Sequence, residues 1–324
     1  MSRALVLPLG LLLAAAVALS VGQVAVDMGT LWSGLWGEGP GALILRTIRG
    51  PRVFTALGAG AVLGLSGWLF QTLFRNPLAA PDIMGFTSGA GLAVVGAIAF
   101  GLALPFPVVA ALGGLAAAAL VAGLSWRPGH ATPPLTLILV GLGVGFMTSA
   151  LSTFLLTRLP HAEAAEAQRW LTGSLAARDW SHVAQVWGLG AVLVGAVAVQ
   201  LRRLAALELG EDLAAGLGLR VGRARMAIAA TAVLLAATGV AVCGPVPFVA
   251  LMSGPLGARL TGARSLGGGM AAAMGAGALV VVLADLAARA ALPGIQLPVG
   301  VMTGILGAPY LLWRLSREMD KGGL

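Results

Sequence analysis

Lysine is almost absent from this chain. Its only lysine is Lys321, and nineteen arginines supply the other basic side chains. A Walker A phosphate loop requires a lysine directly after its glycines to reach the nucleotide phosphates, and Lys321 follows Asp320 instead. The sequence therefore excludes a P-loop and a Schiff-base lysine in a core position. If ATP drives this protein, another polypeptide hydrolyses it.

Cysteine and histidine are also scarce. The single cysteine, Cys243, excludes an intramolecular disulfide and a cysteine metal cluster, and we interpret it as a small core residue. The three histidines all fall in predicted loops (His130, His161 and His182). No serine in an apolar run has a base on another run, so the sequence offers no nucleophile–base pair. We predict no enzyme activity, no catalytic residue, no metal site and no cofactor.

Charged residues make up only 10% of the chain, apolar residues make up 58%, and the mean hydropathy is +0.95. Such a composition cannot cover a soluble globule with polar surface. The chain is predicted to be one polytopic membrane domain over residues 1–324, surrounded by membrane lipid. Gly22-Gln-Val-Ala25 loosely suits a leader cleavage site, so a cleaved leader is the alternative to a first membrane span.

The fold class is all-α, a membrane helical bundle. A span needs ~20 mostly apolar residues, and ten apolar runs recur at about 4–26, 53–74, 85–104, 107–126, 135–157, 183–201, 226–245, 249–258, 268–288 and 298–315. The run at 249–258 is too short to cross as a straight helix. It follows Gly244-Pro-Val-Pro-Phe248, so we predict a half-helix packed inside protein, where broken backbone is tolerated.

The basic residues predict the orientation of the spans. With the N-terminus in the cytoplasm, thirteen basic residues fall on the inner side and seven on the outer side. The positive-inside rule therefore favours two cytoplasmic termini. Because the arginines lie in short loops between apolar runs, they do not indicate a nucleic-acid-binding face. Arg46, Arg49 and Arg52 break the rule on the outer side, which suggests anionic head groups, a loop without a role, or an acidic protein partner.

Three motifs resemble those of one family. Arg49-Gly-Pro-Arg52 opens an apolar span that ends in Asn76-Pro-Leu-Ala79, and Gln296-Leu-Pro-Val-Gly300 precedes Gly307-Ala-Pro309. Between them, residues 204–219 match a Leu-Gly-x-x-x-Ala-x-x-Leu-Gly segment. The chain is similar to FecCD-like permease subunits of binding-protein-dependent ABC importers, which move ferric siderophores, haem or cobalamin. The resemblance covers about residues 46–317 and implies a type II importer permease architecture in a bacterial inner membrane.

The resemblance also implies sites. The docking residues for the solute-binding protein would be Arg49, Arg52 and Arg289. The segment at about 204–219 would couple to the ATPase, through Leu209, Gly210, Ala214, Leu217 and Gly218. A cytoplasmic gate would consist of Asn76, Leu78, Pro134 and Leu135.

Three positions depart from the family pattern. Pro134-Leu135 stands where small hydroxylated residues are usual, Gln296 replaces a glutamate, and Leu256 replaces a histidine. Asn76 also has a simpler interpretation, because Asn before proline favours a turn. The two roles of Asn76 are compatible.

The predicted function is the membrane permease of an ABC importer that takes a metal chelate from a binding protein. A ferric siderophore is the favoured cargo, and haem or cobalamin is the alternative. Its partners would be a second permease subunit, identical or paralogous, two ATP-binding subunits and a solute-binding protein. An ion-coupled secondary transporter is the competing class. It would ordinarily carry ionisable groups within its spans, and only Asp285 lies inside an apolar run.

Overall fold

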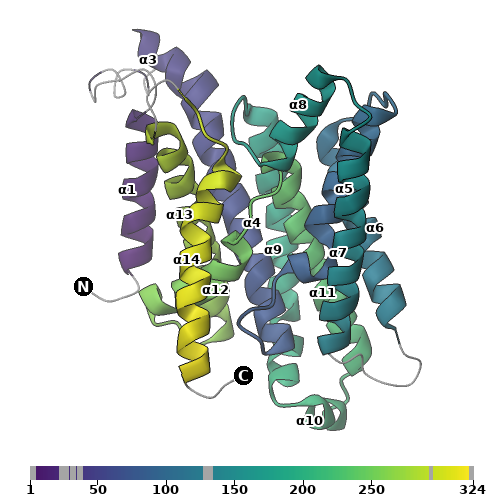
Figure 1. Cartoon of the computed structure of the whole chain (residues 1–324). Coiled ribbons are helices and arrows are strands. Elements are labelled where there is room, and N and C mark those ends of the chain that lie inside the picture. Colours follow the sequence, from purple (N-terminus) through teal and green to yellow (C-terminus); the bar gives the residue numbers. More distant parts are fainter. Residues whose placement is uncertain are drawn as a thin grey trace.

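The structure is a computed structural model that describes residues 5–21, 29, 34, 39–126, 134–291 and 295–320. The elements of these residues are all helical, as the apolar runs predict. Figure 1 shows the long helices running roughly side by side, with α8 (His161–Leu171) at one end of the bundle and α10 (Glu211–Gly216) at the other. We call these the α8 end and the α10 end.

The other elements mostly follow the predicted runs, apart from three short ones at 39–43, 44–49 and 81–84 that lie outside them. They are α1 (Val6–Ser20), α3 (Gly39–Leu43), the π-helix η2 (Ile44–Arg49), α4 (Gly50–Phe74), the 3-10 turn η3 (Pro81–Met84), α5 (Phe86–Ala99), α6 (Phe106–Ser125), α7 (Pro134–Leu156), α9 (Trp180–Glu208), α11 (Val221–Cys243), α12 (Val249–Thr261), α13 (Leu266–Ala290) and α14 (Val299–Asp320). The half-helix expected at 249–258 is α12. The possible cleavage site at 22–25 lies outside the described residues.

Six described helices are long and apolar enough to cross a membrane. They are Gly41–Phe74, Phe106–Ser125, Thr136–Leu156, Trp180–Glu208, Val221–Cys243 and Leu266–Ala290. The apolar helices α1 and α5 are shorter. These lengths agree with a membrane helical bundle, whereas the count of ten spans remains a prediction.

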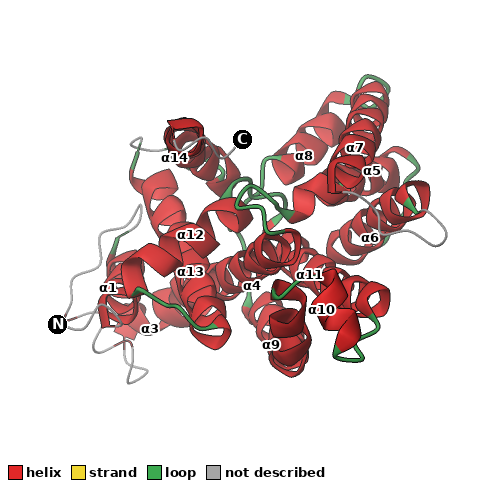
Figure 2. Ribbon diagram, turned by 90° about the horizontal axis from the view of Figure 1, so that it is seen from below, coloured by secondary structure: helices red, strands yellow, loops and turns green. Residues whose placement is uncertain are grey.

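Helix α4 is the centre of the bundle. In its most apolar window 83% of the residues are buried, and it packs against α9, α11, α12 and α13. Figure 2, seen from the α10 end, shows α4 and α11 between two groups of helices. One group contains α1, α12, α13 and α14, and the other contains α5, α6 and α7.

Glycines bring α4 and α13 into backbone contact. A Cβ added at Gly60 would collide with the carbonyl oxygen of Gly277, and a Cβ at Gly277 would collide with that of Gly60. Small residues allow this close approach between membrane helices. Gly64 also meets α13, whereas Gly58 packs against α9 and Gly67 against α12, so the glycines of α4 serve close packing with three neighbouring helices.

The outward faces of several helices are apolar. Only 22% of the apolar window of α7 is buried, and Phe146 and Phe154 on that helix are 73% and 54% exposed. On α9, Val192 and Val199 are exposed as well. Apolar faces of this extent fit contact with lipid or with another subunit.

Candidate functional site

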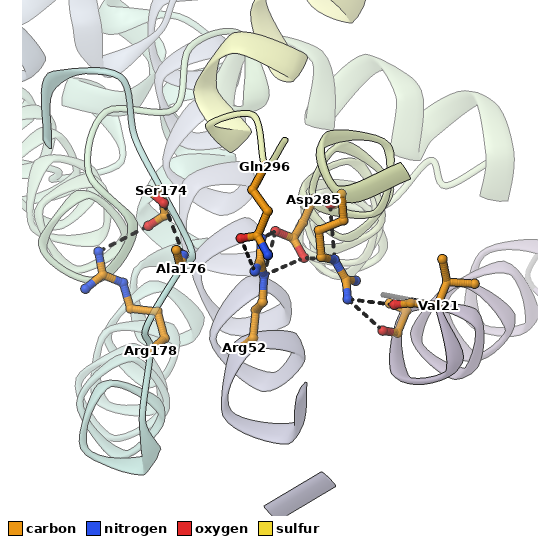
Figure 3. A network of polar contacts seen from close by, with 9 residues as sticks. Val21, Arg52, Ser174, Ala176, Arg178, Asp285 and Gln296 are labelled. Atoms are coloured by element: carbon orange, nitrogen blue, oxygen red, sulfur yellow. Dashed lines mark hydrogen bonds and ion pairs between the residues drawn. The ribbon is translucent and has the colours of Figure 1, made fainter. Parts of the chain in front are cut away.

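At the α8 end, α4 and α13 are joined by an ion pair. Nε of Arg52 lies 3.0 Å from Oδ1 and 3.1 Å from Oδ2 of Asp285, and a terminal guanidinium nitrogen lies 2.7 Å from Oδ1. The other terminal nitrogen of Arg52 is 3.4 Å from Oε1 of Gln296. Figure 3 shows the guanidinium of Arg52 in contact with both Gln296 and Asp285. Two-point pairing of this kind orients both side chains.

The same carboxylate also receives Arg289, one helical turn later on α13. Nε of Arg289 is 3.1 Å from Oδ2 of Asp285. Its NH1 group donates to the carbonyl oxygens of Ala18 and Val21 at 3.1 and 2.9 Å. Its NH2 group is buried and has no hydrogen-bond partner among the described residues. Arg289 therefore links α13 to the end of α1.

Arg49 makes a parallel contact. Its NH1 group donates to the carbonyl oxygens of Leu19 and Ser20 at 2.7 and 2.6 Å. The last carbonyls of a helix have no partner within the helix, and cations stabilise that end. Two arginines thus cap the C-terminus of α1.

The structure therefore brings the three predicted docking arginines together. The sequence leads us to expect guanidinium groups that face outward, but Arg49 and Arg289 are only 5% and 8% exposed. The side chain of Arg52 is 12% exposed. Their described contacts are structural, and their docking role remains a prediction.

Beside this cluster, a loop leads from α8 into α9. Asp179 is the N-cap of α9, and its carboxylate accepts hydrogen bonds from the backbone of Ser181 and His182. These contacts lower the pKa of Asp179, the side-chain hydrogen bond from Ser181 most of all. Arg178 donates to the carbonyl oxygen of Ser174 at 3.1 Å, and burial lowers the pKa of its guanidinium.

At the α10 end, the predicted coupling segment forms a short helix. Ala214 is buried, whereas Leu209, Leu213 and Leu217 are 59%, 62% and 70% exposed. Glu211 accepts a hydrogen bond from Arg225 at the start of α11, which holds the segment in place. The three exposed leucines, on α10 and beside it, form an apolar surface that is suited to contact with another protein.

Two glycines set the shape of that segment. Gly210 has φ 116° and ψ 158°, and Gly218 has φ 81°. Residues that carry a side chain rarely adopt these backbone conformations. A Cβ at either position would meet nothing within 4 Å, so conformation alone requires glycine there.

The two halves of the predicted gate lie near the same end. The side-chain oxygen of Asn76 accepts a hydrogen bond from the backbone of Leu78 at 2.9 Å, so Asn76 does form a turn. Pro134 is the first residue of α7, a position that proline favours. The side chains of Pro134 and Leu135 lie outside what the structure describes.

Sequence reasoning missed a cavity between the helices, whose wall is mostly apolar but carries Asp82 and several hydroxyl groups. It has a volume of about 460 Å³ and is lined by η3, α5, α7, Leu171 and Pro245. Asp82 and Thr87 also line an adjoining cavity of about 260 Å³ that extends to Gly300 and Val301 on α14. The turn η3, which carries Asp82, contacts α4, α5, α6, α7 and α11, and so lies within the bundle.

The wall of this cavity offers oxygen acceptors. Thr87 donates its hydroxyl proton to Asp82, and Ser88, Ser152 and Thr153 donate theirs to backbone carbonyls three or four residues earlier. Their remaining lone pairs are available to the cavity. The three hydroxyl residues Ser149, Ser152 and Thr153, spaced by three and one in an apolar run, are the signal in the sequence that points to this cavity.

Comparison with known proteins identifies the family to which this chain belongs. The model of the FecCD transport family matches residues 10–317. The chain belongs to the FecCD transport family. Membership makes it a permease of the ABC importer type, and with the apolar helices it makes the chain a multi-pass inner-membrane protein.

Individual relatives are similar to this chain over nearly its full length. The ferric enterobactin transport system permease of Escherichia coli K12 is 36% identical, over 99% of this chain and 98% of its own. The vitamin B12 import system permease of Yersinia enterocolitica is 32% identical, over 95% of this chain and 90% of its own. An inward-facing structure of a metal-chelate type ABC transporter has a TM-score of 0.83 and 28% identity, over 97% and 98% of the two chains.

Proposed function

We propose that this FecCD family member carries a ferric siderophore across the inner membrane. The full-length similarity to a ferric enterobactin permease carries the proposal. Cobalamin is the second candidate, because the vitamin B12 permease is also similar over nearly the whole chain. Haem is a further alternative cargo, and only the resemblance of the sequence motifs supports it.

The cargo passes through the cavity lined by Asp82 and the hydroxyl residues of α5 and α7. Polar groups exposed on a membrane helix are costly in lipid, which supports a water-filled passage here. The exposed face of α7 beside it is covered by a second permease subunit, identical or paralogous. Asn76, Leu78, Pro134 and Leu135 constrict the passage at the α10 end.

The α8 end faces outward and the α10 end faces the cytoplasm, with both termini inside and ten spans in a single domain. The count of basic residues on the two sides supports this orientation. The solute-binding protein docks at the α8 end. Arg52 and Arg289 share the carboxylate of Asp285, so these three side chains together keep one surplus positive charge, which attracts acidic groups. Arg49 contributes by fixing α1.

Two ATP-binding subunits contact the segment at 204–219, and Leu209, Leu213 and Leu217 present the apolar surface that they bind. ATP binding moves this segment and tilts the helices around the passage. An ion-coupled secondary transporter would need no such segment.

Reconstitution tests this proposal. The permease, its ATP-binding subunits and its binding protein are placed in proteoliposomes, and uptake is measured for a ferric catecholate, a ferric hydroxamate, ferric citrate, haem and cobalamin. We expect uptake of a ferric catecholate that requires both ATP and the binding protein. The permease alone should hydrolyse no ATP. Uptake driven by a proton gradient without ATP would contradict the proposal and favour the secondary transporter.

A further inference from the structure

Arg75 connects the two functional segments at the α10 end. Its NH2 group donates to the carbonyl oxygens of Leu207 and Glu208 at 2.7 and 2.6 Å. Arg75 directly precedes Asn76 of the constriction turn, and the two acceptors end α9 just before Leu209 and Gly210. We propose that Arg75 is a positioning residue that transmits movement of the 204–219 segment to the turn at residues 76–78.

The backbone of Arg75 is unusual. It is the C-cap of α4 with φ 49° and ψ 32°, a left-handed conformation that glycine normally supplies. The next residue closes the helix, because the N–H of Asn76 donates to the carbonyl oxygen of Gln71 at 3.1 Å. An arginine held in a sparsely populated conformation points to a role for its side chain. Here that conformation accompanies a guanidinium that reaches α9.

The acceptors on α9 need a donor from outside the helix. The last carbonyls of a helix lack partners within it, and a positive charge is favourable at this end. The carbonyl of Leu207 also receives the N–H of Gly210 at 3.2 Å. One carbonyl therefore joins Arg75 to Gly210, the N-cap of the coupling helix α10.

The elements on either side can carry a displacement. The coupling helix α10 is attached to α11 by the contact of Glu211 with Arg225, and α4 is packed in the centre of the bundle. Beyond Arg75, the turn is held by the contact of Asn76 with Leu78. A shift of α10 therefore has a continuous hydrogen-bonded path to the constriction. This inference rests on the proposed coupling role of residues 204–219.

The test compares Arg75→Gln with Arg75→Lys and with the control Arg203→Gln. Arg203 is exposed on α9, and its replacement removes the same charge from the same end of the molecule. Each variant is reconstituted with the ATP-binding subunits and the binding protein. Both ATP hydrolysis and chelate uptake are then measured, with the chelate that the wild type transports.

For Arg75→Gln we expect normal assembly, ATP hydrolysis close to wild type, and uptake per ATP reduced about fivefold or more. Arg75→Lys should lose less, because an ammonium can reach one carbonyl at a time. Arg203→Gln should match the wild type. An unchanged uptake per ATP in Arg75→Gln would overturn the inference, as would equal losses of uptake and hydrolysis, which indicate a merely structural role.

If Arg75→Gln fails to assemble, Arg75→Lys decides the question. A lower uptake per ATP then supports the role of Arg75, and a wild-type ratio overturns it. Failure of the proposed function is separate, since the wild type itself would then show no ATP-dependent uptake.

Discussion

Asp285 holds the guanidinium groups of two arginines, and the contact with Arg52 spans 233 residues of sequence. The side chains of Asp285 and Arg52 are 2% and 12% exposed. Removing one partner of a buried pair leaves a charge without compensation, which typically costs about 3–5 kcal/mol. Asp285→Asn should therefore lower the unfolding temperature of the detergent-solubilised permease.

The double variant Asp285→Asn, Arg52→Gln is the informative control for that effect. It removes both charges of the pair, so it should be more stable than Asp285→Asn alone. Thermal unfolding of the four members of this cycle measures the coupling. Additive effects of the two substitutions would show that the ion pair contributes nothing.

The same two substitutions separate docking from other roles of the arginines. Asp285→Asn raises the positive charge at the α8 end, and Arg52→Gln lowers it. If this charge attracts the binding protein, affinity should rise in the first variant and fall in the second, and both differences should shrink with added salt. Binding is measured below the unfolding temperature in nanodiscs without anionic lipid. Changes in the same direction in both variants would contradict docking by charge.

The helices could be predicted from the sequence more fully than the site. Apolar runs decide where a membrane helix forms, so the run at 107–126 became α6 (Phe106–Ser125). The run at 4–26 predicted the end of its helix less accurately, because α1 ends at Ser20. Hydropathy overlooked α8, since its polar residues form a helix too short to span, although Glu163 in its first turn and Arg169 in its last are typical of helix ends.

Side-chain partners could not be predicted in the same way. The motif Arg49-Gly-Pro-Arg52 singles out two arginines of the polar cluster, but the carbonyls that accept from Arg49 lie about thirty positions earlier, on α1. Their proximity depends on the packing of α1 against α13 and α4. Asp82 was overlooked for a related reason, because a position between two apolar runs suggests a loop at the membrane surface, whereas the turn η3 is folded into the bundle.

The N-cap of α9 predicts a dependence on pH. The folded pKa of Asp179 lies below its ordinary value of 3.8 because Ser181 and His182 donate hydrogen bonds to the carboxylate. Its contribution to stability is therefore complete above about pH 4 and is lost as the pH falls through the folded pKa. Hydrogen-exchange protection at the start of α9, taken relative to the intrinsic exchange rate at each pH, should fall on acidification. Asp179→Asn, which still caps the helix, should remove this part of the loss of protection, and an identical pH profile of protection in both proteins would contradict the assignment.

Gly210 tests the coupling segment directly. Its φ of 116° is strained for any other residue, while a Cβ there would meet nothing within 4 Å. Gly210→Val should therefore cost about 1–3 kcal/mol through backbone conformation and turn α10 away from its partner. Gly216→Ala is the matched control, because Gly216 belongs to α10, has no positive φ, and also has open space around its Cβ position. Co-purification of the ATP-binding subunits should fall in Gly210→Val and persist in Gly216→Ala, with normal membrane insertion of both. Full assembly and uptake in Gly210→Val would show that residues 204–219 form an ordinary loop.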